Sequence, residues 1–324
     1  MSHAGPVVVL AGGLSHEREV SLHSGRRVAD ALAEAGVEVA LRDVDALTVA
    51  ALAAEPPAAV FPLLHGAAGE DGAIRTVLEL LGIGYVGSRP PACRLAFDKP
   101  AARTVLSQVG VRVPEGIVLP HSTFRDLGAP ALLERIVARL GLPLVVKPVR
   151  GGSALGLTVV HDAAALPAAM VGAYAYAESA LVERAVLGTE VAVAVLDLGG
   201  PRSEPTALPA VEIVPDGGSY DYAARYTPGL TEFFCPARMD DAVAEVAAET
   251  AVRAHRALGL RHLSRADLIV DQDGCVWFLE CNVSPGMTDT SLLPLAVEAA
   301  GLDLPTVCAD LVDAAVREQH SLLT

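Results

Sequence analysis

The chain has 324 residues, 52% of them hydrophobic and 19% charged, so it can bury a large core and is not a disordered chain. Acidic residues (39) outnumber basic ones (24) and give a net charge of −15, which argues against a general nucleic-acid binder or a membrane-surface protein. Five cysteines without a Cys-x-x-Cys pair, no signal-peptide pattern and no apolar run near the roughly 18 residues of a membrane span indicate a reduced, cytoplasmic protein.

The first part of the chain alternates predicted strands and helices. The strands are predicted at 6–10, 37–44 and 58–64, and the helices at 21–35 and 71–81. This alternation is typical of an open parallel α/β sheet, whose ligands bind at the carboxyl ends of the strands. We place this first domain at residues 1–97.

The rest of the chain carries a glycine-rich loop and a second group of strands. The loop, 150–156, joins two predicted strands and does not open a helix, and 220–236 has the polar, aromatic composition of a long functional loop. The predicted strands are 144–148, 157–160, 180–184, 190–196 and a hairpin of 266–270 with 275–280. The predicted helices are 99–110, 242–258, 292–301 and 304–316.

Three oxygen-bearing side chains fall in the hairpin. Asp267 and Glu280 lie on neighbouring strands and can face the same side, and Asn282, two residues after Glu280, shares that face. Carboxylate and amide oxygens are the ligands that Mg²⁺ prefers. The alternative is an ordinary solvated strand, but lone carboxylates among such apolar neighbours are costly unless they are paired or metal-bound.

Two residue types are almost absent from the chain. Of the 24 basic residues only Lys99 and Lys147 are lysines, and Asn282 is the single asparagine. Lys147 ends a strand just before the glycine-rich loop, whose backbone N–H groups could close over a phosphate. A surface role is the usual reading of a lone lysine, yet this chain uses arginine elsewhere, so a phosphate role is an equal alternative.

The turn after the first strand carries acidic residues. Glu17 and Glu19 would repel phosphate there but could hold an ammonium group, although Glu19 also suits the first turn of a helix by compensating the helix dipole. His65 ends the third strand, where a structural role is commoner than a catalytic one. No nucleophile elbow is present.

These features together resemble the D-alanine–D-alanine ligases of the ATP-grasp superfamily, over residues 7–316. The matching stretches are GGLSHEREVSLHSG (12–25), HGAAGEDG (65–72), DKPAAR (98–103), LPLVVKPVRGGSALGL (142–157), LVERAVLGTEVAVAV (181–195), SYDYAARYTPG (219–229), FFCPA (233–237), RADL (265–268) and LECNVSPGMTDTSLLP (279–294). The resemblance implies three α/β domains, 1–97, 98–185 and 186–324, with ATP held between the central and C-terminal ATP-grasp domains and an N-terminal open parallel-sheet domain.

The resemblance also implies roles for individual residues. ATP would be bound by Lys99, Lys147, Glu183, Arg184, Val186, Glu190, Arg225 and Leu279. Two Mg²⁺ ions, with Mn²⁺ as a possible substitute, would be held by Asp267, Glu280 and Asn282. Glu17 would hold the ammonium group of the first D-alanine and form a hydrogen-bonded set with Ser153 and Tyr226. His65 would also bind substrate, and Arg265 and the Gly286 N–H would sit at the reacting carbonyl oxygen. The second carboxylate would be bound by Ser291 and the Leu292 N–H.

The implied activity is ATP-dependent joining of two D-alanines through an acyl phosphate, for peptidoglycan synthesis, cell-wall biogenesis and cell shape. Relatives that make D-alanyl-D-lactate typically have His where this chain has Tyr226, so we expect an amine as second substrate. The glycine-rich loop departs from the family's common REGSSVG pattern at Gly151 and Ala154. The resemblance therefore does not establish which contacts this loop makes with the lid.

Two other functions remain open at this point. One is a specialised ligase that joins D-alanine to another D-amino acid or an antibiotic-related amine. The other is a catalytically silent ATP-binding regulator, although no metal ligand or ATP lysine is missing. The resemblance implies a homodimer as well, while the expected partners are small molecules, D-alanine and ATP, and neither nucleic acid nor a membrane.

Overall fold

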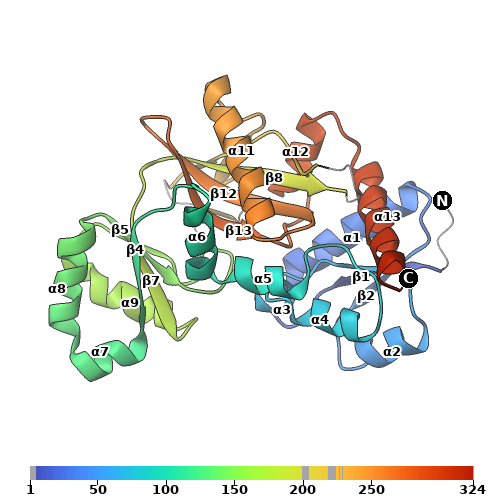
Figure 1. The fold of residues 1–324 in the computed structure, drawn as a ribbon, viewed down its shortest axis with the longest axis horizontal. Helices are drawn as coiled ribbons and strands as arrows, with labels where there is room; N and C mark the ends of the chain where they lie inside the picture. The colour runs from blue at the N-terminus through green and yellow to red at the C-terminus, as the bar shows by residue number, and fades with distance from the viewer. Residues whose placement is uncertain (1–4, 199–203, 218–223, 226, 228, 324) are drawn as a thin grey trace.

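The structure, a computed structural model, describes residues 5–198, 204–217, 224–225, 227 and 229–323. Its strands form three sheets in chain order, and helices cover their faces (Figure 1). The N-terminal sheet is parallel, whereas the central and C-terminal sheets are antiparallel. This architecture is the ATP-grasp fold with an N-terminal open sheet, as predicted.

The N-terminal sheet has the strand order β2-β1-β3. All five residues of β1 are buried, as expected for the central strand of a parallel sheet. Helices α1 and α13 pack on one face, and α2 and α4 on the other. The bounds are β1 Val7–Ala11, α1 Arg18–Glu34, β2 Val39–Asp43, α2 Thr48–Ala54, β3 Ala59–Pro62, α4 Ala73–Leu80 and α13 Leu304–Leu323.

The central sheet has four strands in the order β4-β7-β5-β6 and packs against α7, α8 and α9. The glycine-rich loop joins β5 to β6, as predicted, and Ser153 and Ala154 in it have φ of 52° and 56°. The bounds are β4 Gly116–Pro120, α7 His121–Leu127, α8 Ala129–Leu140, β5 Leu144–Pro148, β6 Thr158–Val160, α9 Leu166–Tyr174 and β7 Ser179–Arg184, with a 3₁₀ turn at Ala163–Ala165.

The C-terminal sheet has the order β11-β10-β8-β12-β13, with β9 paired to β8. Alternate residues of β8 enter two cores, one under α11, α5 and α6 and the other shared with α12 and the N-terminal sheet. The bounds are α5 Pro90–Phe97, α6 Lys99–Gln108, β8 Gly188–Asp197, β9 Thr206–Ala207, β10 Val211–Pro215, β11 Thr231–Phe234, α11 Asp241–Ala257, β12 His262–Asp271, β13 Val276–Asn282 and α12 Leu292–Ala299.

One expectation for this region was wrong. The segment 220–236 is not a loop throughout, because residues 231–234 form β11 and pair in register with β10. This short strand forms because its backbone pairs with β10, and a single sequence does not reveal such a pairing. The domain boundaries near residues 97 and 185 fall between the sheets and stay a prediction.

Within the part of the chain that the structure describes, no single helix has the length and apolar character needed to cross a membrane. Helices α12 and α13 reach that length and composition only as a pair, bent by 108°. Their buried residues pack in the core beside the N-terminal sheet.

Candidate active site

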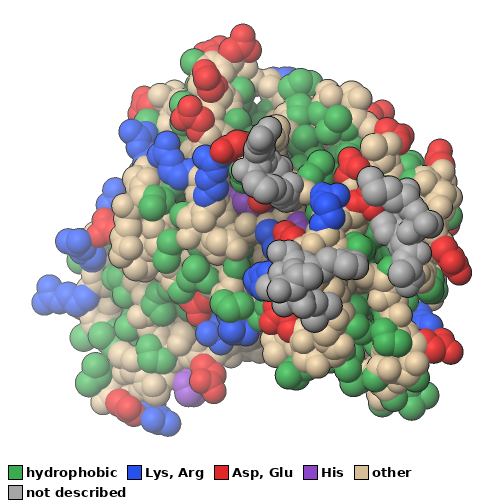
Figure 2. Space-filling view, turned by 45° about the vertical axis from the view of Figure 1, so that its right-hand side comes forward, with side chains coloured by type: hydrophobic (Ala, Val, Ile, Leu, Met, Phe, Trp, Pro, Cys, Tyr) green, Lys and Arg blue, Asp and Glu red, His purple; other side chains and the backbone are tan. Residues whose placement is uncertain are grey.

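Two cavities meet where the sheets converge. One, of about 900 Å³, lies between the central and C-terminal sheets. The other, of about 670 Å³, is lined by all three parts of the chain. Histidine, acidic and basic side chains meet in the hollow at the centre of the face drawn in Figure 2. Both cavities share the residues Lys99, Gly151, Gly152, Arg225 and Glu280, so a group bound in one can be passed to the other.

Lys147 is buried in the wall of the larger cavity. It lies on β5, and its Nζ is 2.6 Å from Oε1 of Glu183 on the adjacent strand β7. Arg103 of α6 takes the other oxygen of Glu183, at 2.5 Å, and also donates to the carbonyl oxygen of Pro114. Glu183 therefore holds both Lys147 and Arg103. These contacts fix the ammonium group of Lys147 at the cavity wall.

Lys99 stands at the junction of the two cavities. Asp98 caps the N-terminus of α6 by accepting from the Ala101 N–H, so Lys99 opens that helix. Its Nζ donates to the carbonyl oxygen of Gly151 at 2.7 Å and lies 3.2 Å from Oε2 of Glu280. A cation is thereby held between the glycine-rich loop and β13.

The three candidate metal ligands share one face of the C-terminal sheet. Asp267 pairs in register with Glu280, and Arg265 with Asn282, as the predicted hairpin requires. Burial would raise the pKa of Glu280, but Lys99, Lys147 and Arg225 lower it to about 2, so it is an anion. Two carboxylates and an amide oxygen on one face of two paired strands are a donor set that fits Mg²⁺. Among the described residues, no group of three or more His, Cys, Asp or Glu side chains is placed to hold a metal ion, so the Asn282 amide is needed to complete a set of three.

Arg265 connects this face to the smaller cavity. Its guanidinium donates two hydrogen bonds to Asp267, Nε to Oδ1 at 2.6 Å and Nη2 to Oδ2 at 2.8 Å. Such a bidentate pair fixes the plane of the guanidinium. Because Arg265 also lines the smaller cavity, a positive charge faces the space beside Glu280.

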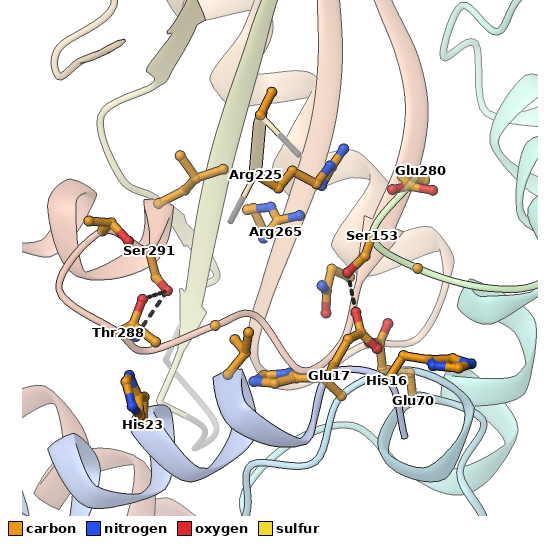
Figure 3. Close-up of a pocket in the computed structure, with 18 of the residues that line it drawn as sticks. His16, Glu17, His23, Glu70, Ser153, Arg225, Arg265, Glu280, Thr288 and Ser291 are labelled. Atoms are coloured by element: carbon orange, nitrogen blue, oxygen red, sulfur yellow. Dashed lines mark hydrogen bonds between the residues drawn. The ribbon is translucent and has the colours of Figure 1, made fainter. Parts of the chain in front are cut away.

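Glu17 lies at the opposite side of the smaller cavity (Figure 3). It directly precedes α1, is 7% exposed, and accepts a hydrogen bond from the hydroxyl of Ser153 in the glycine-rich loop. The contact joins the N-terminal domain to a loop 136 residues further along the chain. The family resemblance implied a hydrogen-bonded set of Glu17, Ser153 and Tyr226; Tyr226 lies outside the described residues.

The start of α12 forms another wall of the smaller cavity. Ser291 precedes the helix, and its Oγ accepts from the Thr288 N–H at 2.9 Å and lies 2.8 Å from the Thr288 hydroxyl. A Cβ at position 286 would come within 2.8 Å of Ser291 Oγ, so any larger residue there would displace that hydroxyl. Leu292 is the first residue of α12, so its backbone N–H points out of the helix end, where anions bind favourably.

His65 is buried between the N-terminal sheet and this loop. Its Nδ1 donates to the Ser284 carbonyl oxygen at 3.0 Å, and its Nε2 lies 3.4 Å from the Ser24 hydroxyl. Burial lowers the pKa of His65 to about 4, so the ring is neutral at physiological pH. It lines the smaller cavity as a neutral group that also joins two domains.

The remaining predicted residues line the larger cavity. They are Arg184, Val186, Glu190, Arg225 and Leu279. Burial raises the pKa of Glu190 to about 7, against the attraction of Arg225. Every predicted site residue within the described part of the chain therefore borders one of the two cavities.

Two charged residues of the site, Glu70 and Arg103, are not among those predicted from the sequence. Both stand inside motifs that carry the resemblance, HGAAGEDG and DKPAAR, but neither has an implied role. Glu70 is 7% exposed and lines the smaller cavity, and Arg103 is the second cation on Glu183. Their position inside those motifs is the sequence signal that could have identified them as site residues.

Comparison with known proteins gives one consistent result. The family model described as D-ala D-ala ligase C-terminus matches residues 105–313. A D-alanine–D-alanine ligase of Bordetella petrii is 43% identical over 317 residues, covering 98% of this chain and 94% of that protein.

Solved structures agree with the sequence relatives. The VanG D-Ala:D-Ser ligase of Enterococcus faecalis superposes with a TM-score of 0.81 at 27% identity, covering 96% of this chain and 99% of that one. A Bacillus anthracis D-alanine–D-alanine ligase complexed with ATP superposes with a TM-score of 0.79 at 24% identity, covering 98% of this chain and 99% of that one. The chain belongs to the D-alanine–D-alanine ligase family.

Proposed function

We propose that the protein joins two D-alanine molecules into D-alanyl-D-alanine at the expense of ATP, with an acyl phosphate as the intermediate, for peptidoglycan synthesis. The observation that carries this function is the pair of adjoining cavities that share Lys99, Gly151, Gly152, Arg225 and Glu280. A phosphoryl group bound in the larger cavity can reach a carboxylate bound in the smaller one at that junction. Names of relatives over nearly the full chain support it.

ATP occupies the larger cavity in this proposal. Lys147 and Lys99 hold its phosphates, because both are buried cations at the wall and at the junction. Glu183, Arg184, Val186 and Leu279 border the adenine, and Glu190 the ribose. Arg225 adds a third cation beside the transferred phosphoryl group.

Asp267, Glu280 and Asn282 would hold two Mg²⁺ ions, and Mn²⁺ could substitute. Such ions would supply positive charge that offsets the charge of the phosphates during phosphoryl transfer. Lys99, whose Nζ is 3.2 Å from Glu280, and Arg265, which donates to Asp267, are the cations beside these ligands.

The two amino acids share the smaller cavity. Glu17, held by Ser153, binds the ammonium group of the first D-alanine, and His65 borders it as a neutral side chain. Arg265 and the Gly286 N–H face the carbonyl oxygen and stabilise the oxyanion that forms when the second amine attacks. Ser291 and the Leu292 N–H bind the second carboxylate at the start of α12.

Water has to be kept from the acyl phosphate, since hydrolysis would waste ATP. The segment that contains Tyr226 has the lid role in this proposal. With Tyr at this position, and not a histidine that could carry positive charge, the second substrate is an amine. We place the enzyme in the cytoplasm, where ATP is made, and we expect it to act as a homodimer.

The function is tested with purified protein, ATP and Mg²⁺ by measuring phosphate release and identifying the product by mass spectrometry. D-Alanine alone is expected to give D-alanyl-D-alanine with one phosphate per dipeptide. D-Serine and D-lactate are tested as second substrates beside it. If phosphate appears only when D-lactate or another D-amino acid is added, the proposed substrate pair is wrong.

A further inference from the structure

Glu70 is a buried carboxyl group of the smaller cavity for which the proposed reaction has no task so far. It ends the short helix α3, residues Ala67–Glu70, and is 7% exposed. Its Oε1 accepts from the Gly66 N–H at 2.9 Å. In the described part of the chain, no hydrogen bond reaches its second oxygen, and the side chain borders the cavity (Figure 3).

Glu17 and Glu70 border the same small space. A Cβ built on Gly152 would lie 3.4 Å from Glu17 Oε1 and 3.9 Å from Glu70 Oε1. Gly66 lies against both carboxyl groups as well, because its N–H binds Glu70 while a Cβ there would meet Glu17 Oε2 at 2.5 Å. Because positions 66 and 152 are glycines without side chains, the carboxyl groups of Glu17 and Glu70 can both lie in this space.

Two such groups cannot both be anions at low cost when no cation is present. Burial raises the pKa of Glu70 to about 8, and the charges of Glu17 and Glu280 act in the same direction. The Gly66 N–H and Lys99 oppose this effect only in part. Without substrate, Glu70 therefore holds a proton near neutral pH.

An ammonium group has three N–H donors and one positive charge, and both need partners when it is buried. The Ser153 hydroxyl already occupies Oε1 of Glu17. Within the described residues no hydrogen bond is made to Oε2 of Glu17 or to the second oxygen of Glu70, so both can accept from an ammonium group that enters the cavity they line. One carboxylate alone would leave donors of the ammonium group without charged partners.

We propose that Glu70 is a second carboxyl group of the pocket that binds the ammonium group of the first D-alanine, together with Glu17. This inference rests on the proposed function. When the ammonium group enters, Glu70 releases its proton to solvent and becomes the second carboxylate around the cation. The pocket then selects an amino acid over a plain carboxylic acid through two anions.

The first-substrate site is tested alone by replacing the second amino acid with hydroxylamine, which traps the acyl phosphate as D-alanyl hydroxamate. Glu70→Gln is expected to raise the KM for D-alanine at least about tenfold and to leave the KM for ATP within about twofold. Glu70→Asp keeps the charge and should fall between Gln and wild type. Glutamine can still accept from the Gly66 N–H, and thermal melting verifies that the variant is folded.

Asp71→Asn is the matched control, because it neutralises the adjacent carboxylate while asparagine can still accept from the Ala73 N–H. It should behave as wild type. A second readout is calorimetric titration of the whole enzyme with D-alanine at pH 7 in two buffers of different ionisation enthalpy. Wild type is expected to release close to one proton on binding, and Glu70→Gln none.

An unchanged KM for D-alanine in Glu70→Gln, or equal proton release in variant and wild type, overturns the assignment of Glu70. Failure of the proposed function looks different. In that case the wild-type enzyme itself forms no hydroxamate from D-alanine and ATP, whatever residue stands at position 70.

Discussion

At the scale of single residues, rarity was the most informative signal in the chain. Lys99, Lys147 and Asn282 are the only members of their types, and all three line the cavities. Glu70 could not be found in this way, because it is one of 39 acidic residues and only the fold reveals its burial beside Glu17. The rarity of a residue type therefore indicated three cavity residues of this chain, but it could not indicate a buried acid.

Lys147→Arg should impair ATP use although the positive charge is kept. The side chain of Lys147 is 7% exposed, and Arg103 already occupies the other oxygen of Glu183, so a larger forked guanidinium does not fit. We expect kcat/KM for ATP to fall about 100-fold, which is about 2.7 kcal/mol of transition-state stabilisation. Lys99→Arg should lower kcat/KM for ATP in the same way.

Steady-state kinetics at varied ATP measure this effect. Arg139→Lys is the matched control, since Arg139 is 72% exposed in its ion pair with Glu115 and should tolerate the exchange. Normal turnover of both lysine variants would mean that the rarity of lysine in this chain is chance.

Asp267→Asn should separate nucleotide binding from turnover. Asparagine has nearly the same shape but lacks the charge that Mg²⁺ and Arg265 require. We expect ATP to bind within about tenfold of wild-type affinity while kcat falls at least about 100-fold. Binding calorimetry and phosphate release measure the two effects. Asp273→Asn, in the exposed hairpin turn, serves as the control, and equal kcat in the two variants would contradict the role of Asp267.

At the scale of elements, hydrophobic periodicity predicted the strands that carry the site. The hairpin of β12 and β13 places Asp267 opposite Glu280, as its spacing requires. Helices α5, α7 and α8 are not predicted from the sequence pattern, although Pro90 and Pro91 at the start of α5 are a known helix-opening signal. Strand β10 has five residues and β11 has four, too few for a clear pattern. They form because β10 pairs with β8 and β11 pairs with β10.

Gly69→Ala tests whether α3 holds the ammonium pocket in place. A Cβ at position 69 would come within 1.7 Å of the Leu64 carbonyl oxygen, and backbone cannot yield easily there. We expect the variant to lose about 2–3 kcal/mol of unfolding free energy and most of its D-alanine-dependent activity, because Glu70 moves with the helix.

Denaturant unfolding and the hydroxamate assay measure these two effects. Gly172→Ala in helix α9 is the matched control, since no atom lies within 4 Å of its built Cβ. That exchange should keep or raise stability by up to about 1 kcal/mol. Comparable losses in both variants would show that the crowding at Gly69 is not the cause.

At the scale of the whole molecule, buried neutral histidines join the N-terminal sheet to the rest. His65 binds the Ser284 carbonyl oxygen, and Nδ1 of His262 accepts from the Gly87 N–H at 2.9 Å. Burial lowers the pKa of both rings. Nothing in the local sequence predicts these contacts, because each partner lies more than 150 residues away in the chain. Only the way the domains pack brings these groups together.

Acid should therefore loosen the contact between the domains. The pKa of His65 is about 4 in the folded protein and about 6.5 in the unfolded chain. The unfolded chain thus binds more protons between these values, so the stability from neutral His65 is complete above pH 6.5 and is lost as the pH falls to 4. The loss amounts to about 3 kcal/mol for this residue.

Urea unfolding of wild type and His65→Asn at pH 7, 5.5 and 4.5 measures this loss. Asparagine does not titrate, so the variant should be less stable than wild type at pH 7, and the difference should shrink steadily toward pH 4.5. His161→Gln, at an exposed position, should run parallel to wild type throughout. A difference between His65→Asn and wild type that stays constant with pH would show that the contact between His65 and Ser284 stabilises the domain interface without linking it to protonation.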